Sequence, residues 1–94
     1  MIQSYKDPRV KRLYEGESIR VWAALRRQAE KRLRILDAAD RLEMLMLLPS
    51  NRFEALHGNR QGQYSIRINE RWRICFTWPA GAPGPGEVEI VDYH

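Results

Sequence analysis

Three polar side chains at the end of the sequence could carry out acid–base chemistry. Asp92, Tyr93 and His94 follow an apolar run that ends with Ile90 and Val91. In an extended strand, Asp92 and His94 would share one face and Tyr93 would point to the other. A carboxylate, a phenol and an imidazole can accept and return protons, and the terminal carboxylate on His94 should favour its imidazolium form. Because chain ends are usually frayed and inert, the triplet alone does not identify an active site.

Two arginines upstream could bind a phosphate group. Alternating apolar residues predict two strands of a hairpin, over residues 64–68 and 72–78. A three-residue loop, 69–71, pairs Ile66 with Ile74 and buries both, whereas a two-residue loop would mix apolar and basic residues on one face. The longer loop places Arg67 opposite Arg73, where like charges repel. Either this pair is exposed and screened by salt, or an anion such as phosphate normally lies there.

Basic charge is also concentrated elsewhere in the chain. With Arg60 and His57 on the preceding segment, the face that carries Arg67 and Arg73 could form a phosphate cradle. The segment from Lys6 to Arg34 holds ten basic residues against four acids, in a chain with 16 Lys and Arg and 12 Asp and Glu. Such a surface favours polyanions, and a solvated helix face is the alternative interpretation.

Length and composition limit the class of protein. The 94 residues are enough for one domain, 1–94, and the balance of 44% hydrophobic and 30% charged residues is typical of a folded protein. Cys75 is the one cysteine, so no internal disulfide can form, and the cytoplasm is the expected location. The sequence shows no signal peptide and no membrane span. The histidines, the cysteine and the carboxylates show no metal-ligand spacing, so no metal or cofactor is expected.

The first half of the chain reads as helical after a short strand over residues 1–5. Asp7 and Pro8 predict the start of a helix that Gly16 ends. A second helix is expected over 20–39, with an apolar stripe formed by Trp22, Leu25, Ala29, Leu33 and Leu36. Residues 40–43 resemble a capping box with Asp40 in place of Ser or Thr, which would open a short helix through Leu48.

The second half reads as strands. After the hairpin, the proline- and glycine-rich residues 79–86 form a surface loop, and residues 87–91 make the last strand. The expected fold is therefore α+β, with an N-terminal strand and helices packed on a small twisted antiparallel sheet.

Three segments carry a resemblance to a known family. They are Gly62-Gln63-Tyr64-Ser65-Ile66-Arg67-Ile68-Asn69, Trp72-Arg73-Ile74-Cys75-Phe76 and Val88-Glu89-Ile90-Val91-Asp92-Tyr93-His94. With them, essentially the whole chain resembles the HigB-type killer-protein toxins of type II toxin–antitoxin modules, within the RelE superfamily. The resemblance implies a RelE-like fold and a ribosome-dependent endoribonuclease, or mRNA interferase. It also implies, as partners, the ribosome, messenger RNA and a HigA-like antitoxin that carries a helix-turn-helix domain.

The resemblance also implies which residues act. The family's sheet arginine falls on Arg73, and its terminal Asp-Tyr-His falls on Asp92, Tyr93 and His94. The family usually has Lys-Gly-Asp-Arg where this chain has a segment that begins with His57, which makes that basic group titratable. Candidate catalytic residues are Arg73, Asp92, Tyr93, His94 and His57. Candidate RNA-binding residues are Arg67, Arg60, Arg71, Lys31 and Arg34.

The expected reaction is metal-free attack of a ribose 2′-hydroxyl on the adjacent phosphate. Arg73, helped by Arg67, would stabilise the charge that develops on the phosphate, and His94 is the first candidate for proton transfer. The acid and base roles stay open among His94, Tyr93, Asp92 and His57. Because the site is expected at the chain end, residues appended after His94 should impair cleavage more than residues placed before Met1.

Two other functions compete with cleavage. Some family members carry a catalytic histidine where Glu54 stands, so the chain could be a weakly active or non-catalytic ribosome or RNA binder. A gyrase-poisoning relative of the same fold is the third hypothesis, and the terminal Asp-Tyr-His argues against it.

Overall fold

A four-stranded antiparallel sheet, in the order β1-β2-β3-β4, forms one layer of the protein. The computed structural model describes residues 1–92, so the predicted site residues Tyr93 and His94 lie outside the described part. The strands are β1 (Glu54–Ala55), β2 (Gln63–Arg67), β3 (Trp72–Thr77) and β4 (Gly86–Asp92). The helices are α1 (Pro8–Tyr14), α2 (Arg26–Ala38) and α3 (Leu42–Met46), with short 3-10 helices η1 (Arg20–Leu25), η2 (Pro49–Asn51) and η3 (Gly58–Arg60).

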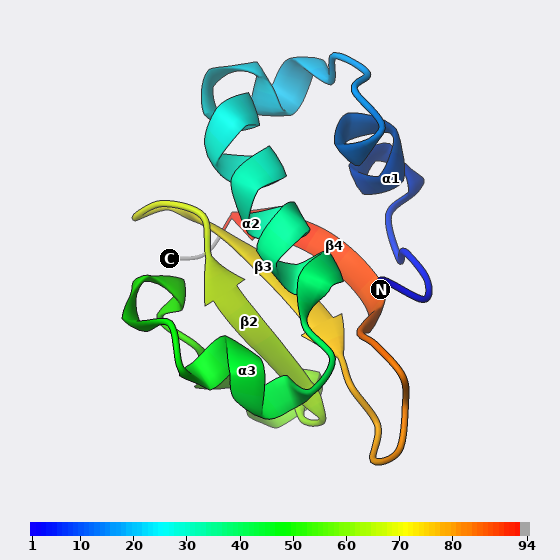
Figure 1. Cartoon of the computed structure of the whole chain (residues 1–94). Coiled ribbons are helices and arrows are strands. Elements are labelled where there is room, and N and C mark those ends of the chain that lie inside the picture. Colours follow the sequence, from blue (N-terminus) through cyan, green and yellow to red (C-terminus); the bar gives the residue numbers. More distant parts are fainter. Residues whose placement is uncertain (93–94) are drawn as a thin grey trace.

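The helices form the second layer, and α2 crosses one face of the sheet (Figure 1). That face and the buried side of α2 share one hydrophobic core, which includes Ala29, Leu33, Leu36, Ile66, Ile74, Phe76, Val88 and Ile90. The apolar stripe predicted for the second helix is therefore confirmed as core, and so is the α+β class. In the described residues 1–92, no helix combines the length and the apolar character that a membrane crossing requires.

The predicted hairpin register is confirmed. Ile66 pairs with Ile74 and Arg67 pairs with Arg73 across β2 and β3. The side chain of Asn69 shapes the three-residue loop, because its Oδ1 accepts hydrogen bonds from the backbone N–H groups of Arg71 and Trp72, at 2.9 and 2.8 Å. Because side chains alternate along a strand, Ile66 and Ile74 face α2, whereas Arg67 and Arg73 leave the sheet on the face that α2 does not cover.

The predicted ends of α1 are confirmed. The Asp7 side chain caps the helix by accepting a hydrogen bond from the backbone N–H of Arg9 at 3.0 Å, and Pro8 opens the first turn. Gly16 follows the helix with a φ of 102°, a left-handed conformation that glycine adopts without steric cost.

The helix predicted over 20–39 is divided into η1 and α2. Trp22 and Leu25 have non-helical backbone angles and are both buried. In a 3-10 helix, residues three apart lie directly above one another, so η1 turns both of these side chains toward the core before α2 begins. An apolar stripe does not reveal such a change of helix type.

The capping box predicted at residues 40–43 is wrong. The N-cap position belongs to Arg41, which makes no side-chain capping bond, and α3 ends at Met46 rather than Leu48. Leu42 is half-buried and Leu45 is fully buried against the core. Packing of these two residues, three apart on one side of α3, therefore outweighs the local capping signal.

The predicted N-terminal strand is also wrong. Only Tyr5 forms a bridge, in parallel with Val88 of β4. Pro85 has no backbone N–H, and the N–H of Glu87 donates to the Ser4 hydroxyl at 2.9 Å, so a continuous ladder cannot form along residues 1–5. The two-residue strand β1, which the sequence pattern did not predict, pairs with β2 instead.

Candidate functional site

Arg73 lies on the sheet face that α2 leaves uncovered, and its guanidinium is buried. The side chain is only 8% exposed. Its Nε donates to the hydroxyl of Ser65 at 2.8 Å, and its Nη2 donates to the backbone carbonyl of Arg52 and, at 3.5 Å, to that of Ser65. Ser65 is itself fully buried in β2. These contacts hold the guanidinium in one orientation on β3, an inner strand of the sheet.

The backbone of Arg52 is shaped to accept this bond. Arg52 follows η2 with φ 47° and ψ 47°, in the left-handed region, where a residue with a side chain is about 1–2 kcal/mol less stable. The conformation turns its carbonyl toward Arg73, and hydrogen bonds from charged donors are stronger than neutral ones. The bond to Arg73 therefore helps to offset the strain at Arg52.

Glu54 brings a carboxylate to the same guanidinium. It stands opposite Ser65 in the β1–β2 register, and its Oε1 lies 3.4 Å from Arg73 Nη2. About half of the Glu54 side chain is exposed, so the carboxylate faces both Arg73 and solvent. From the sequence, Glu54 is recognisable only as a departure from the family pattern, and nothing in the local pattern predicts its contact with Arg73.

The structure resolves the repulsion predicted between Arg67 and Arg73 in a way that the sequence did not indicate. An exposed, salt-screened pair is wrong for Arg73, because this side chain is buried and bonded to Ser65, Arg52 and Glu54. Arg67 is half-buried and lies 3.7 Å from the exposed carboxylate of Glu70. Internal partners therefore make the pair possible without an anion between the two groups.

Arg60 lies on the same face and is also paired. Its Nη1 lies 3.0 Å from the side-chain oxygens of both Gln63 and Glu89, and Lys6 approaches Glu89 at 3.5 Å. These groups surround the fully buried Cys75, and burial raises the pKa of its thiol. A buried thiol with a raised pKa is a poor nucleophile at neutral pH.

Asp92 and Arg73 leave the sheet on opposite faces. In the β3–β4 register Asp92 stands opposite Trp72, whereas Arg73 stands opposite Val91. The Asp92 carboxylate instead accepts two hydrogen bonds from Arg71, at 2.9 Å from Nε and 2.7 Å from Nη2. The guanidinium of Arg71 also lies over the Trp72 ring, 5.4 Å from its centroid. Two predicted site residues, Arg71 and Asp92, thus form an ion pair with each other.

The remaining predicted residues are dispersed. His57 is exposed in the turn between β1 and η3. Lys31 and Arg34 are exposed on α2, which crosses one face of the sheet (Figure 1), whereas Arg73 leaves the sheet on the other face. Among the described residues, no three histidine, cysteine or acidic side chains are close enough together to hold a metal ion.

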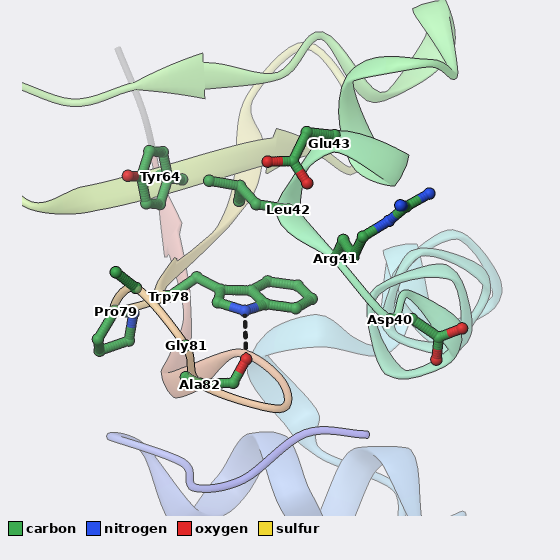
Figure 2. Close-up of a pocket in the computed structure, with 10 residues that line it drawn as sticks. Asp40, Arg41, Leu42, Glu43, Tyr64, Trp78, Pro79, Gly81 and Ala82 are labelled. Carbon is green, nitrogen blue, oxygen red and sulfur yellow. Dashed lines mark hydrogen bonds between the residues drawn. The ribbon is translucent and has the colours of Figure 1, made fainter.

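A hollow of about 420 Å³ lies apart from this face (Figure 2). Tyr64 and Trp78 line it from the apolar side of the hairpin, Asp40 to Glu43 line it from the start of α3, and Ala82 closes it from the 79–86 loop. The indole N–H of Trp78 donates to the Ala82 carbonyl at 3.0 Å, as Figure 2 shows. This hollow has no contact with Arg73, Ser65 or Glu54.

Comparison with known proteins agrees with this architecture. Residues 3–94 match the profile of a family described as the RelE-like toxin of the type II toxin–antitoxin system HigB. Toxin HigB-1 of Vibrio cholerae serotype O1 is 35% identical over 83 residues, which cover 86% of this chain and 87% of that protein.

A solved structure shows the same fold. A chain of the YoeB-YefM complex from Staphylococcus aureus superposes with a TM-score of 0.56 at 22% identity and covers 100% of this chain and 98% of that one. At this identity the likeness shows the fold, which is RelE-like as expected. The profile match and the Vibrio cholerae relative show the family: this chain belongs to the HigB-like, RelE-like toxins of type II toxin–antitoxin systems.

Proposed function

We propose that this toxin is a ribosome-dependent endoribonuclease that cleaves translated messenger RNA at the sheet face around Arg73. The observation that carries the proposal is the buried guanidinium of Arg73, held by Ser65 and the Arg52 carbonyl and facing the half-exposed carboxylate of Glu54. A fixed cation beside a solvent-accessible carboxylate is a suitable arrangement for phosphate chemistry, because one group stabilises negative charge and the other accepts a proton.

Arg73 would stabilise the transition state. Negative charge increases on the phosphate oxygens when the 2′-oxygen attacks phosphorus, and a donor already in place costs no reorganisation at that moment. Ser65 and Arg52 supply that order here. Burial strengthens the interaction, since electrostatic forces are larger where water is excluded. Removal of such a group typically lowers the rate by about 10²-fold or more.

Glu54 joins the candidates for the general base. In the proposed step the 2′-hydroxyl gives its proton to a base as its oxygen bonds to phosphorus, and the bond from phosphorus to the 5′-oxygen breaks. An acid then protonates the leaving 5′-oxygen, so the products are a 2′,3′-cyclic phosphate and a 5′-hydroxyl. Glu54 lies beside Arg73 and is accessible to a substrate. Its position supports the base role without any contribution from Asp92.

The proton donor would come from Tyr93, His94 or His57. Tyr93 and His94 follow Asp92 directly, and the ion pair between Arg71 and Asp92 ties this part of β4 to the hairpin loop. We therefore assign Asp92 a positioning role rather than contact with the phosphate. His57 is exposed within the segment that joins β1 to β2 and remains a further candidate.

The partners of this activity would be the ribosome, messenger RNA and an antitoxin. Membership of a toxin–antitoxin family supports a dedicated antitoxin, and the structural neighbour was solved as a YoeB-YefM complex. We propose that the antitoxin carries a helix-turn-helix domain, as in other modules of the HigB kind, and that the toxin acts in the cytoplasm, where ribosomes translate.

The decisive experiment is translation of a defined message on purified ribosomes, with mapping of the message ends. Wild type should produce new ends within the translated region, whereas Arg73→Lys and His94→Ala should produce far fewer. Arg73→Lys keeps the buried positive charge but loses the planar fork of donors, so a melting curve must show that it folds. A chemical step that depends strongly on Mg²⁺, measured apart from ribosome integrity, would contradict the scheme.

One observation favours a second function, a ribosome or RNA binder with little or no cleavage. The Arg73 side chain is 8% exposed and several of its donors are bound within the protein, which is also what a purely structural arginine requires. On this alternative, wild type binds ribosomes and leaves the message ends identical to the controls. That result would reject the enzyme, whereas cuts that disappear in stably folded Arg73→Lys would reject the binder.

A further inference from the structure

A second pocket, of about 420 Å³, lies where α2, η2 and the β2–β3 loop meet. Its polar lining combines three arginines with neutral groups, and Glu70 supplies its acidic side chain. The lining includes Gln28, Arg32, Ser50, Arg52, Arg67 and Asn69. A pocket lined by three arginines and one acidic residue has an excess of positive charge and attracts anions.

Arg32 is held toward this pocket by neutral groups. It is half-buried, and its Nη1 donates to Asn51 Oδ1 at 2.9 Å and to the hydroxyl of Ser50 at 3.3 Å. Within residues 1–92, no carboxylate forms a salt bridge with it, and burial lowers its pKa. The fold therefore bears the cost of partly burying a cation without giving it a charged partner, and a bound anion would recover that cost.

The other two arginines are weakly compensated. Arg52 is exposed, and over the described part of the chain its side chain makes no salt bridge. Its hydrogen bond to Arg73 is made by the backbone carbonyl and leaves the side chain available for a ligand. Arg67 pairs only loosely with Glu70, at 3.7 Å, and Glu70 is 95% exposed. An ion pair this exposed contributes little to stability, so Arg67 can exchange Glu70 for a phosphate group at little cost.

The pocket adjoins the candidate catalytic site through these same residues. The Arg52 carbonyl accepts a hydrogen bond from Arg73, and Arg67 stands directly opposite Arg73 across the hairpin. A polyanion with regularly spaced charges could thus occupy both places at once. An RNA strand has this character, and guanidinium forks match its phosphate oxygens in bidentate geometry.

We propose that the pocket formed by Arg32, Arg52 and Arg67 binds an RNA backbone phosphate next to the one held at Arg73. The proposal rests on the proposed cleavage of RNA at Arg73 and adds a binding site that positions the strand. Arg32 and Arg52 contribute to affinity and register, and they take no part in bond breaking.

The test compares Arg52→Gln and Arg32→Gln with Arg20→Gln, an exposed arginine on η1 that loses the same charge outside the pocket. Binding of one single-stranded RNA is measured by fluorescence anisotropy at several salt concentrations, with 2′-deoxy nucleotides that prevent attack by the 2′-oxygen. Arg52→Gln should weaken binding about tenfold, the equivalent of one charge-assisted contact. The variant that combines Arg52→Gln with Arg32→Gln should make the negative slope of log affinity against log salt shallower by about 0.7, as expected for one lost phosphate contact.

Kinetics give a second readout. If the pocket only positions RNA, Arg52→Gln should raise the KM for cleavage of the message about tenfold. It should change kcat by less than about twofold, because the contact between Arg73 and the Arg52 backbone is kept. Arg32→Gln could also disturb Asn51, so its melting temperature is measured in parallel. Arg52→Gln has no such complication and decides the outcome.

Binding to ribosomes without message separates the two sources of the phosphate. Lost affinity for the oligonucleotide assigns the pocket to the message, and lost affinity for empty ribosomes alone assigns it to ribosomal RNA. Wild-type affinity and salt slope of Arg52→Gln in both assays would overturn the proposal. If wild type cleaves nothing while Arg52→Gln still binds RNA more weakly, the proposed enzyme fails and the pocket stands.

Discussion

Arg73 and Ser65 are joined by a 2.8 Å hydrogen bond from the guanidinium Nε to the serine hydroxyl, and both residues are buried on the sheet face that α2 leaves open. Ser65 lies two residues before Arg67, the partner of Arg73 in the hairpin register, and on the same face of the sheet. A buried charged group with a buried polar partner has a defined orientation, which is what a preorganised phosphate-binding group needs.

Ser65→Ala should therefore impair both stability and cleavage. The substitution leaves Arg73 Nε without its acceptor in a buried place, so we expect the free energy of unfolding to fall by about 1–3 kcal/mol. Cleavage should fall about tenfold or more at a temperature where the variant is folded, mainly through kcat, because the guanidinium loses its fixed orientation. Urea unfolding and single-turnover cleavage measure the two effects. Ser18→Ala, at an exposed serine, is the control, and unchanged kcat in folded Ser65→Ala would contradict the positioning role.

Glu54→Gln tests the proposed general base. The amide keeps the size of the side chain and removes the carboxylate that lies 3.4 Å from Arg73. We expect cleavage to fall about 10²-fold or more, mainly through kcat, because the amide cannot accept the proton of the 2′-hydroxyl. The matched control is Glu43→Gln on α3, which removes an exposed carboxylate that lines the separate hollow of Figure 2. A wild-type kcat in folded Glu54→Gln would assign the base to another group.

Arg71→Gln separates stability from activity at the end of β4. Its ion pair with Asp92 is exposed on the Arg71 side, so the stability change should stay below about 1 kcal/mol. If the pair positions the residues that follow Asp92, cleavage should nevertheless fall several-fold, and more so at low salt, where the wild-type pair is strongest. A double-mutant cycle with Asp92→Asn measures the coupling. Additive effects on cleavage would show that the pair has no positioning role.

Tyr14→Phe should change the stability of the protein in alkaline solution. Burial and the hydrogen bond to Asp37, at 2.8 Å, raise the pKa of Tyr14 to about 12, above its ordinary value of 10.0. Because the folded-state pKa is raised, this stabilisation is fully present below pH 10 and is lost as the pH rises through 12. Wild type should lose more stability than Tyr14→Phe between pH 10 and 12.

Denaturant unfolding at fixed pH, together with absorbance titration of tyrosine, measures this difference. Asp37→Asn provides the control, because it removes the negative charge and should bring the Tyr14 pKa closer to 10. Parallel stability curves for wild type and Tyr14→Phe across this range would show that Tyr14 ionises equally easily in the folded and unfolded chains.

The features that sequence predicted correctly are set by neighbours in the chain. The α1 cap depends on Asp7 and Pro8, and the hairpin register depends on a period of two and a three-residue loop. The features that it predicted incorrectly depend on distant partners. Leu42 and Leu45 pack on the core and move the start of α3, and Pro85 limits the ladder available to the N-terminal segment.

The same division holds at the candidate site. Sequence alone determined that Arg67 and Arg73 face each other on one side of the sheet, because alternation and loop length are local properties of the chain. Only the tertiary structure decided that Arg73 is buried, since its partners Arg52 and Glu54 come from a segment that folds back beside β2. The left-handed turn at Arg52 has no sequence signature, because its strain is offset by a bond to a residue 21 positions away. Register likewise placed Asp92 beside Arg71 and on the face opposite Arg73, which the residue types alone could not show.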